Sequence, residues 1–197
     1  MTTPKIGIIV GSTRRNRFAD QPAAWIRDLM SARDDLEFEV VDLRDYPLPF
    51  FEDRAAPAYG ALKGEAAHAW AARLATFDGF ILLVAEYNHG PTAVLKNALD
   101  HAFGEFNRKP VTFIGYGGVG GARAVEQLRL VAVELEMAPL RNAVHIGVEA
   151  MLGVVRGGKS LADFPYLGER ALAMLEELSW WSRALKVARQ AAPATAA

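Results

Sequence analysis

Short apolar runs alternate along the chain with stretches that are apolar on one side only. The runs are rich in β-branched residues and end at glycine or polar residues, a pattern typical of buried strands. They predict five strands, at residues 5–10, 36–43, 79–87, 110–117 and 138–147. Because apolar and polar residues do not alternate within these runs, they predict a parallel sheet covered by helices on both faces.

The stretches between the strands repeat apolar residues at helical spacing. One helix is expected to begin near Phe18 or Ala19, which places Pro22 in its first turn, where a missing N–H does no harm. Further helices are predicted at residues 65–75, 92–103, 122–137 and 169–189. Residues 44–64 carry three prolines and several aromatic residues, which predicts a packed loop.

Composition narrows the possible functions. A chain of 197 residues with 51% hydrophobic content predicts one domain, placed at residues 1–190, with residues 191–197 expected as a disordered tail. A formal net charge of −1 argues against nucleic-acid and anionic-membrane partners. The chain has no cysteine and no apolar run of about 20 residues, the length of a membrane span, so we expect a cytoplasmic protein.

Residues 11–17, GSTRRNR, connect the first strand to the first helix. The first N–H groups of a helix have no internal partner, and the helix dipole places positive charge there. Together with the Ser12 and Thr13 hydroxyls and the guanidinium groups of Arg14 or Arg17, this turn is suited to hold a phosphate. It matches neither the GxxxxGK[ST] nor the GxGxxG pattern. The alternative is an ordinary polar turn with solvated arginines.

Two later turns follow the third and fourth strands. Residues 86–91 read EYNHGP, and five of the seven residues from 115 to 121 are glycine. The turn at residues 86–91 offers backbone groups to a flat heteroaromatic ring, with Tyr87 or His89 packing against it. The turn at residues 115–121 allows close approach of a ligand. The alternatives are a helix cap made by Glu86 and Asn88, and a flexible connector. All three turns lie at strand carboxyl ends, which predicts one shared site.

Other kinds of site are not indicated. The histidines His68, His89, His101 and His145 do not have the spacing of a zinc site, so no metal is expected. The chain has neither a GxSxG motif nor a cysteine nucleophile.

The three turns together resemble the NADPH-dependent FMN reductase family, flavodoxin-like proteins that include quinone, azo and chromate reductases. The resemblance covers residues 6–148 through GSTRRNR, EYNHGPTAVLKNALD and YGGVGGARAVEQLR. It implies a three-layer α/β/α fold with a five-stranded parallel sheet in the order 2-1-3-4-5. The family usually places Pro-Gly later before its lysine-bearing helix, whereas this chain has Gly90-Pro91-Thr92-Ala93.

The resemblance also implies which residues bind FMN. The opening turn is expected to hold the phosphate and the two later turns the isoalloxazine ring. The implied residues are Ser12, Thr13, Arg14, Arg17, Phe18, Glu86, Tyr87, Asn88, His89, Tyr116, Gly117 and Gly118. Glu86 and His89 are candidate proton sources.

The implied function is an FMN-dependent oxidoreductase. It would pass hydride from NADPH or NADH through bound FMN to a quinone, azo, flavin or similar small acceptor by a ping-pong mechanism, as a homodimer or homotetramer. The alternative is a flavodoxin-like electron carrier, or a protein that binds another phosphorylated ligand without reductase activity. Carriers of that kind tend to be strongly acidic, and a net charge of −1 argues against one.

Overall fold

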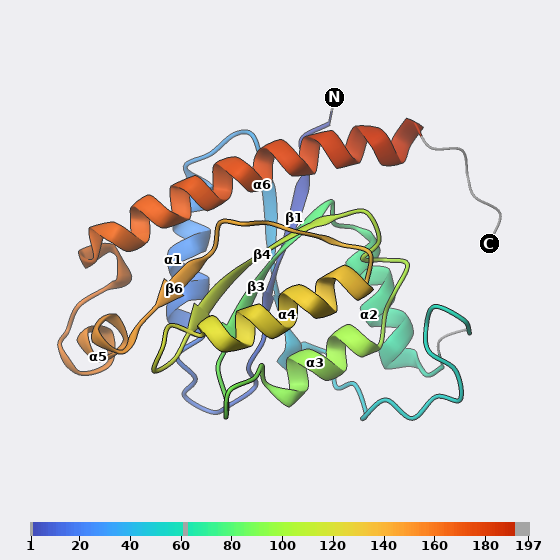
Figure 1. The fold of residues 1–197 in the computed structure, drawn as a ribbon, viewed down its shortest axis with the longest axis horizontal. Coiled ribbons are helices and arrows are strands. Elements are labelled where there is room, and N and C mark those ends of the chain that lie inside the picture. Colours follow the sequence, from blue (N-terminus) through green and yellow to red (C-terminus); the bar gives the residue numbers. More distant parts are fainter. Residues whose placement is uncertain (1, 61–62, 192–197) are drawn as a thin grey trace.

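A computed structural model describes residues 2–60 and 63–191. Its centre is a parallel sheet (Figure 1). The strands are β1 (Lys5–Val10), β2 (Glu37–Asp42), β3 (Gly79–Ala85), β4 (Pro110–Tyr116), β5 (Ala138–Pro139) and β6 (Val144–Ile146). The order β2-β1-β3-β4-β5, with β6 also paired to β4, confirms the predicted fold.

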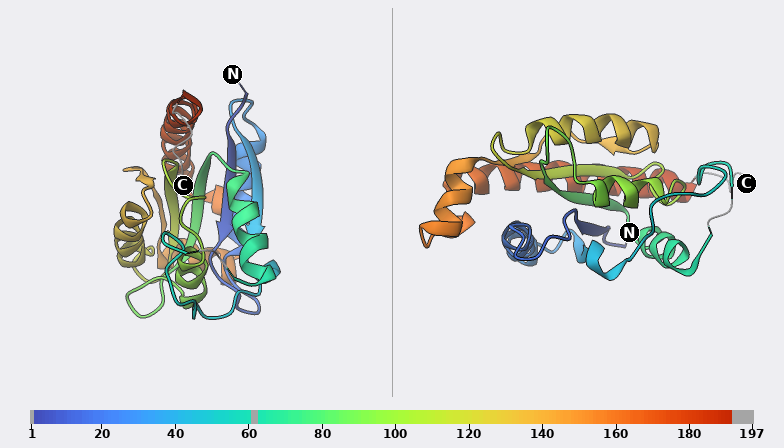
Figure 2. Two further views of the ribbon diagram at one scale, coloured as in Figure 1. Left: turned by 90° about the vertical axis from the view of Figure 1, so that its right-hand side faces the viewer. Right: turned by 90° about the horizontal axis from the view of Figure 1, so that it is seen from below.

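Helices cover both faces of the sheet, as predicted. They are α1 (Asp20–Ser31), α2 (Glu65–Ala75), α3 (Ala93–Asp100), α4 (Ala122–Glu134), α5 (Val148–Arg156) and α6 (Pro165–Ala191), with 3-10 turns η1 (Leu43–Asp45) and η2 (Leu161–Asp163). One core cluster joins the sheet to α1, α5 and α6, and the other joins it to α2, α3 and α4. Figure 2 shows α1 and α4 on opposite sides of the strands.

The bounds of most predicted elements agree with the structure to within three residues, and two elements differ by more. The fifth strand, expected over residues 138–147, is split into β5 and β6. Side chains hold the backbone of the interruption: Thr112 Oγ1 donates to the Asn142 carbonyl over 2.7 Å, and the Arg129 guanidinium donates to the carbonyls of Leu140 and Arg141. Side-chain donors thus replace part of the strand ladder at this edge.

The last helix begins earlier than expected, at Pro165 rather than Glu169. A proline suits the first position of a helix because its missing N–H has no partner there in any case. The helix ends at Ala191, and the rest of the expected tail, residues 192–197, lies outside the described residues. Helix α5 has no counterpart among the predicted elements.

Candidate functional site

A crevice of about 580 Å³ lies where β1, β3 and β4 end, and its volume is within the range of small-molecule sites. The predicted residues that line it are Ser12, Arg14, Arg17, Phe18, Glu86, Tyr87, Tyr116 and Gly117. The other lining residues are Asn16, Gln21, Ala85, Met151, Val154 and Val155. Thr13, Asn88, His89 and Gly118 belong to the same turns but do not line the crevice.

The opening loop places unpaired backbone donors along one side of the crevice. Gly11 fixes its start, because a Cβ there would lie 2.5 Å from the Leu83 carbonyl oxygen, and Thr92 Oγ1 donates to the Gly11 carbonyl. Within the described residues, the N–H groups of residues 12–18 donate to no protein backbone acceptor. A run of free N–H groups before a helix is the arrangement that binds phosphate.

Arg17 supports this loop from beneath. Its side chain is 3% exposed, and all five of its N–H donors are used. They bond to the carboxylates of Asp42 and Asp20 and to the Ser12 carbonyl. Burial opposes the charged guanidinium, but the hydrogen bonds to both carboxylates outweigh it and raise the pKa of Arg17. The role expected for Arg17 therefore changes from contacting phosphate to holding the loop.

Arg14 is the arginine of this loop that both lines the crevice and is free to bind an anion. Its guanidinium carbon lies 6.0 Å from the centre of the Tyr87 ring, a cation–π distance. Among the described residues no carboxylate pairs with it. Arg14 thus keeps its donors for a ligand.

The Tyr116 hydroxyl is a buried polar group without a partner. Its oxygen is inaccessible to solvent and makes no hydrogen bond within the described structure. Burial raises the pKa of Tyr116 above its usual value, so the hydroxyl stays protonated at neutral pH. The Tyr116 ring packs against Phe18 at 5.3 Å between centroids. The hydroxyl is enclosed in the wall beside Ser12, whose side chain lowers the Tyr116 pKa and so partly offsets the effect of burial.

The second turn is a tight hairpin. Tyr87 and Gly90 exchange backbone hydrogen bonds of 2.9 and 3.1 Å, and Asn88 and His89 both have positive φ, as a type I′ turn requires. From α4, Gln127 Nε2 donates to the His89 carbonyl over 2.8 Å. This geometry fixes the backbone of the turn and leaves the His89 side chain exposed outside the crevice.

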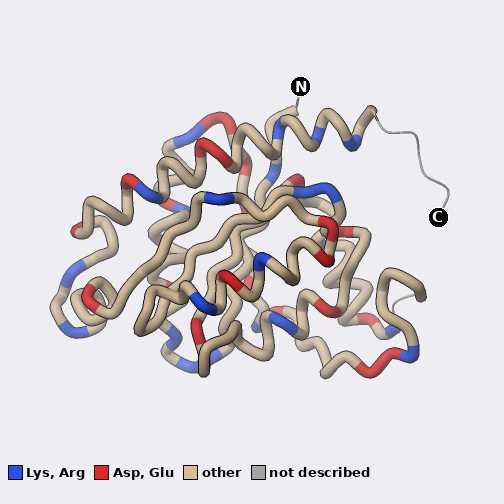
Figure 3. Tube along the Cα trace, viewed as in Figure 1, with Lys and Arg blue, Asp and Glu red and all other residues tan. Residues whose placement is uncertain are grey.

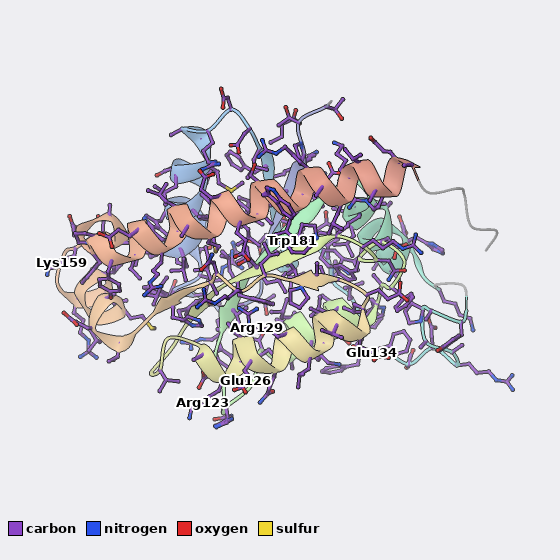
Figure 4. The ribbon with its side chains drawn as sticks, turned by 45° about the horizontal axis from the view of Figure 1, so that its top comes forward. Arg123, Glu126, Arg129, Glu134, Lys159 and Trp181 are labelled. Atoms are coloured by element: carbon purple, nitrogen blue, oxygen red, sulfur yellow. The ribbon has the colours of Figure 1, made fainter. Side chains whose placement is uncertain are left out.

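Glu86 precedes this turn and is committed to α4. Its side chain is 3% exposed and pairs with the Arg123 guanidinium, while Arg123 N–H donates to the same carboxylate over 3.2 Å. Figure 4 shows Arg123 at the end of α4. A carboxylate at a helix N-terminus stabilises the helix. The Glu86 carboxylate is thus committed to α4, whereas the helix that follows the turn, α3, is capped by Thr92, whose Oγ1 accepts from Leu95 N–H. A role for Glu86 or His89 as proton source stays a prediction.

Glycine is required at the end of the third turn. Gly121 has φ +71°, and a Cβ there would lie 2.6 Å from the Tyr116 backbone nitrogen. His145 Nδ1 bonds to the Gly120 carbonyl over 3.0 Å and holds the turn against β6. The turn is therefore packed in place, unlike a flexible connector.

Sequence reasoning missed one wall of the crevice. Met151, Val154 and Val155 line it from α5, at the i, i+3 and i+4 spacing of one helix face. That spacing, followed by Gly157 and Gly158, is a helix signal in the sequence.

The described residues include no cluster of three or more side chains suited to a metal ion. Over the same residues, no helix has the length and apolar character needed to cross a membrane.

Sequence comparisons point to one family. The model of the NADPH-dependent FMN reductase family matches residues 4–150. The chain is 39% identical over 148 residues to the NAD(P)H-dependent FMN reductase C4B3.06c of Schizosaccharomyces pombe, covering 73% of this chain and 74% of that protein. It is 35% identical to a 2-hydroxy-1,4-benzoquinone reductase of Burkholderia sp, covering 68% of this chain and 72% of that one.

The fold also matches solved structures. The flavoenzyme FerB of Paracoccus denitrificans, an NAD(P)H:(acceptor) oxidoreductase, superposes with a TM-score of 0.72 at 20% identity. The superposition covers 92% of this chain and 98% of that one.

Proposed function

Because the chain belongs to the NADPH-dependent FMN reductase family, we propose that the crevice above β1, β3 and β4 is its FMN site. The protein is an oxidoreductase that uses FMN and takes electrons from NAD(P)H. The unpaired donor set of the crevice is the main support for placing FMN there.

That donor set fits FMN. The free N–H groups of residues 12–18 and the unpaired Arg14 guanidinium suit a phosphate dianion. The buried Ser12, which lines the crevice, adds a donor at the same end. Phe18, Ala85 and Tyr116 supply an apolar surface for a flat ring.

The protein's part in the reaction is to hold the reactants in position and to exclude water from them. Bound FMN supplies reversible two-electron chemistry. The Arg17 ion pairs keep the phosphate loop in one conformation, and the hairpin at Tyr87–Gly90, held by Gln127, presents a fixed backbone beside the crevice. We expect a ping-pong mechanism, in which the open crevice receives NAD(P)H and then the acceptor in turn. With Glu86 paired to Arg123, solvent is the proton source.

The acceptor is a small oxidised molecule of the quinone, azo or flavin kind. The named quinone reductase and FMN-dependent NADPH-azoreductase relatives support this range. The alternative is a flavodoxin-like carrier that passes electrons only to a protein partner. The net charge of −1 gives little electrostatic steering toward such a partner, and Figure 3 shows basic and acidic residues interspersed along the chain.

A homodimer in the cytoplasm is part of this proposal. Leu130 and Val133 on α4 are 72% and 62% exposed, and Trp180 on α6 is 59% exposed. Leu130 and Val133, three residues apart on α4, are typical of a helix face that another subunit covers, whereas Trp180 lies on α6, which packs on the other face of the sheet.

A stopped-flow experiment tests the function. Holoprotein mixed anaerobically with NADPH or NADH should lose its flavin absorbance, and a quinone added afterwards should restore it. In steady state, double-reciprocal plots at several quinone concentrations should be parallel. Reduction only by a protein partner, with no response to NADPH or NADH, would instead identify a carrier.

A further inference from the structure

Helix α5 presents two apolar faces that meet at one residue. Met151, Val154 and Val155 line the crevice. Val148, Leu152 and Val155 form a solvent-exposed stripe, with exposures of 52%, 44% and 64%. The spacing of the stripe, i, i+4 and i+7, places its members along one side of the helix. Because Val155 belongs to both sets, the apolar wall of the crevice continues outward over the surface of α5.

The stripe is held in a fixed position. Ala150 is fully buried, and a Cβ on Gly153 would lie 2.8 Å from Phe164 Cζ, so α5 packs closely on the core. The helix ends in a hydrogen-bonded turn, in which Lys159 N–H donates to the Gly153 carbonyl over 3.1 Å. Lys159 Nζ lies 5.2 Å from the centre of the Phe164 ring, at the end of the molecule labelled in Figure 4. The exposure of the stripe therefore does not come from a frayed helix.

We propose that this surface selects acceptors that carry a hydrocarbon chain, namely lipophilic quinones. The quinone ring would enter the crevice, and its chain would leave past Val155 and lie along Leu152 and Val148. From Val148 to Val155 the helix rises about 10 Å, room for a chain of several methylenes. The inference rests on the proposed function, because it names the acceptor of that same site.

A protein partner explains this stripe less well than a chain does. A stable subunit interface buries about 800 Å² on each partner and involves about 20 residues or more. Three side chains on a nine-residue helix fall far short of that. A surface that binds a protein partner need not be continuous with the crevice. A single ligand whose ring lies in the crevice and whose chain lies on α5 does need that continuity.

The reaction balances without a further reactant. One NAD(P)H, one quinone and one proton give NAD(P)⁺ and one hydroquinone. The two electrons reach the quinone through FMN, while both quinone oxygens gain a proton, one originating as the hydride and one from solvent.

The test compares one benzoquinone with and without a decyl chain, at concentrations below micelle formation. For the wild-type holoenzyme we expect kcat/KM to be at least about fivefold higher with the chain, the effect of burying a partly exposed aliphatic surface. Leu152→Gln keeps helix propensity and should remove most of this preference while leaving kcat/KM for the short quinone unchanged. Val148→Gln should reduce the preference in the same direction.

Leu172→Gln is the matched control, because Leu172 is 50% exposed on α6 and does not line the crevice. It should leave the preference intact. An equal loss in Leu152→Gln and Leu172→Gln, an unchanged preference in Leu152→Gln, or a change in subunit number in that variant would overturn the inference. Flavin content and anaerobic reduction by NADPH are measured in every variant. If bound flavin is reduced normally and only the preference is absent, the inference fails alone; if flavin is not bound or not reduced, the proposed function fails.

Discussion

Replacing Arg17 by alanine should destabilise the protein itself more than it weakens FMN binding. The substitution removes five donated hydrogen bonds from a side chain that is 3% exposed. Asp42 keeps three bonds to Arg44 and is therefore not left unpaired, and Asp20 is 53% exposed, so solvent screens its contribution. The loss is thus below the 3–5 kcal/mol typical of a broken buried pair, about 2–3 kcal/mol.

Arg14→Ala is the matched comparison, since the two arginines share one loop. Removing a free side chain should leave the apoprotein within about 0.5 kcal/mol of wild type but weaken FMN binding by about 1–3 kcal/mol. Arg17→Lys should not restore stability, because a lysine ammonium has three donors and no planar fork.

Urea unfolding of the apoproteins and fluorescence titration with FMN separate the two effects. For Arg17→Ala we expect a lower unfolding midpoint, and a thermal midpoint lower by about 5–10 °C. If Arg17→Ala unfolds like wild type and loses FMN affinity as Arg14→Ala does, the donors of Arg17 serve the phosphate and the loop-support argument is wrong.

Two further predictions concern Lys109, which directly precedes β4, and Gly121, which directly precedes α4. Lys109 is buried, and burial lowers its pKa to about 8; because the folded chain then binds fewer protons than the unfolded chain, stability should rise between about pH 8 and 10. Lys109→Met should remove that rise and stabilise the protein at pH 7 by about 1–2 kcal/mol. Urea unfolding at pH 7 and pH 10 checks both effects. If the free energy of unfolding of the variant rises with pH as steeply as that of wild type, the prediction is wrong. Gly121→Ala should lower the free energy of unfolding by about 2–4 kcal/mol, because Gly121 has a positive φ and a Cβ there would contact Tyr116 N. Gly118→Ala is the control, since its Cβ would meet nothing within 4 Å, and it should be neutral. Thermal unfolding compares the two, and equal effects would contradict the strain argument.

The sequence predicted the sheet well because buried parallel strands carry an unambiguous apolar pattern. The bounds of β1, at Lys5–Val10, and of α2, at Glu65–Ala75, match the structure. The last strand was less accurate, since its interruption depends on Thr112 and Arg129, side chains that are distant in sequence. A local pattern does not contain such contacts.

For the site, the sequence predicted the turns but not what each side chain does in them. Arg14 and Arg17 look equivalent in GSTRRNR, and they are separated by the bonds of Arg17 to Asp20 and to Asp42, which lies at the end of the neighbouring strand. Likewise, Glu86 follows a strand and reads as a crevice residue, whereas the start of α4 brings Arg123 against it. Pairings between elements decide these roles, and the pattern within one element does not encode them.

The most direct test of the phosphate loop is a titration of apoprotein with FMN and, separately, with riboflavin, which has the same ring and no phosphate. The free N–H groups of residues 12–18 and Arg14 predict that FMN binds at least about 100-fold more tightly, since several charge-assisted hydrogen bonds depend on the phosphate. Equal affinities for the two flavins would contradict the assignment of this loop.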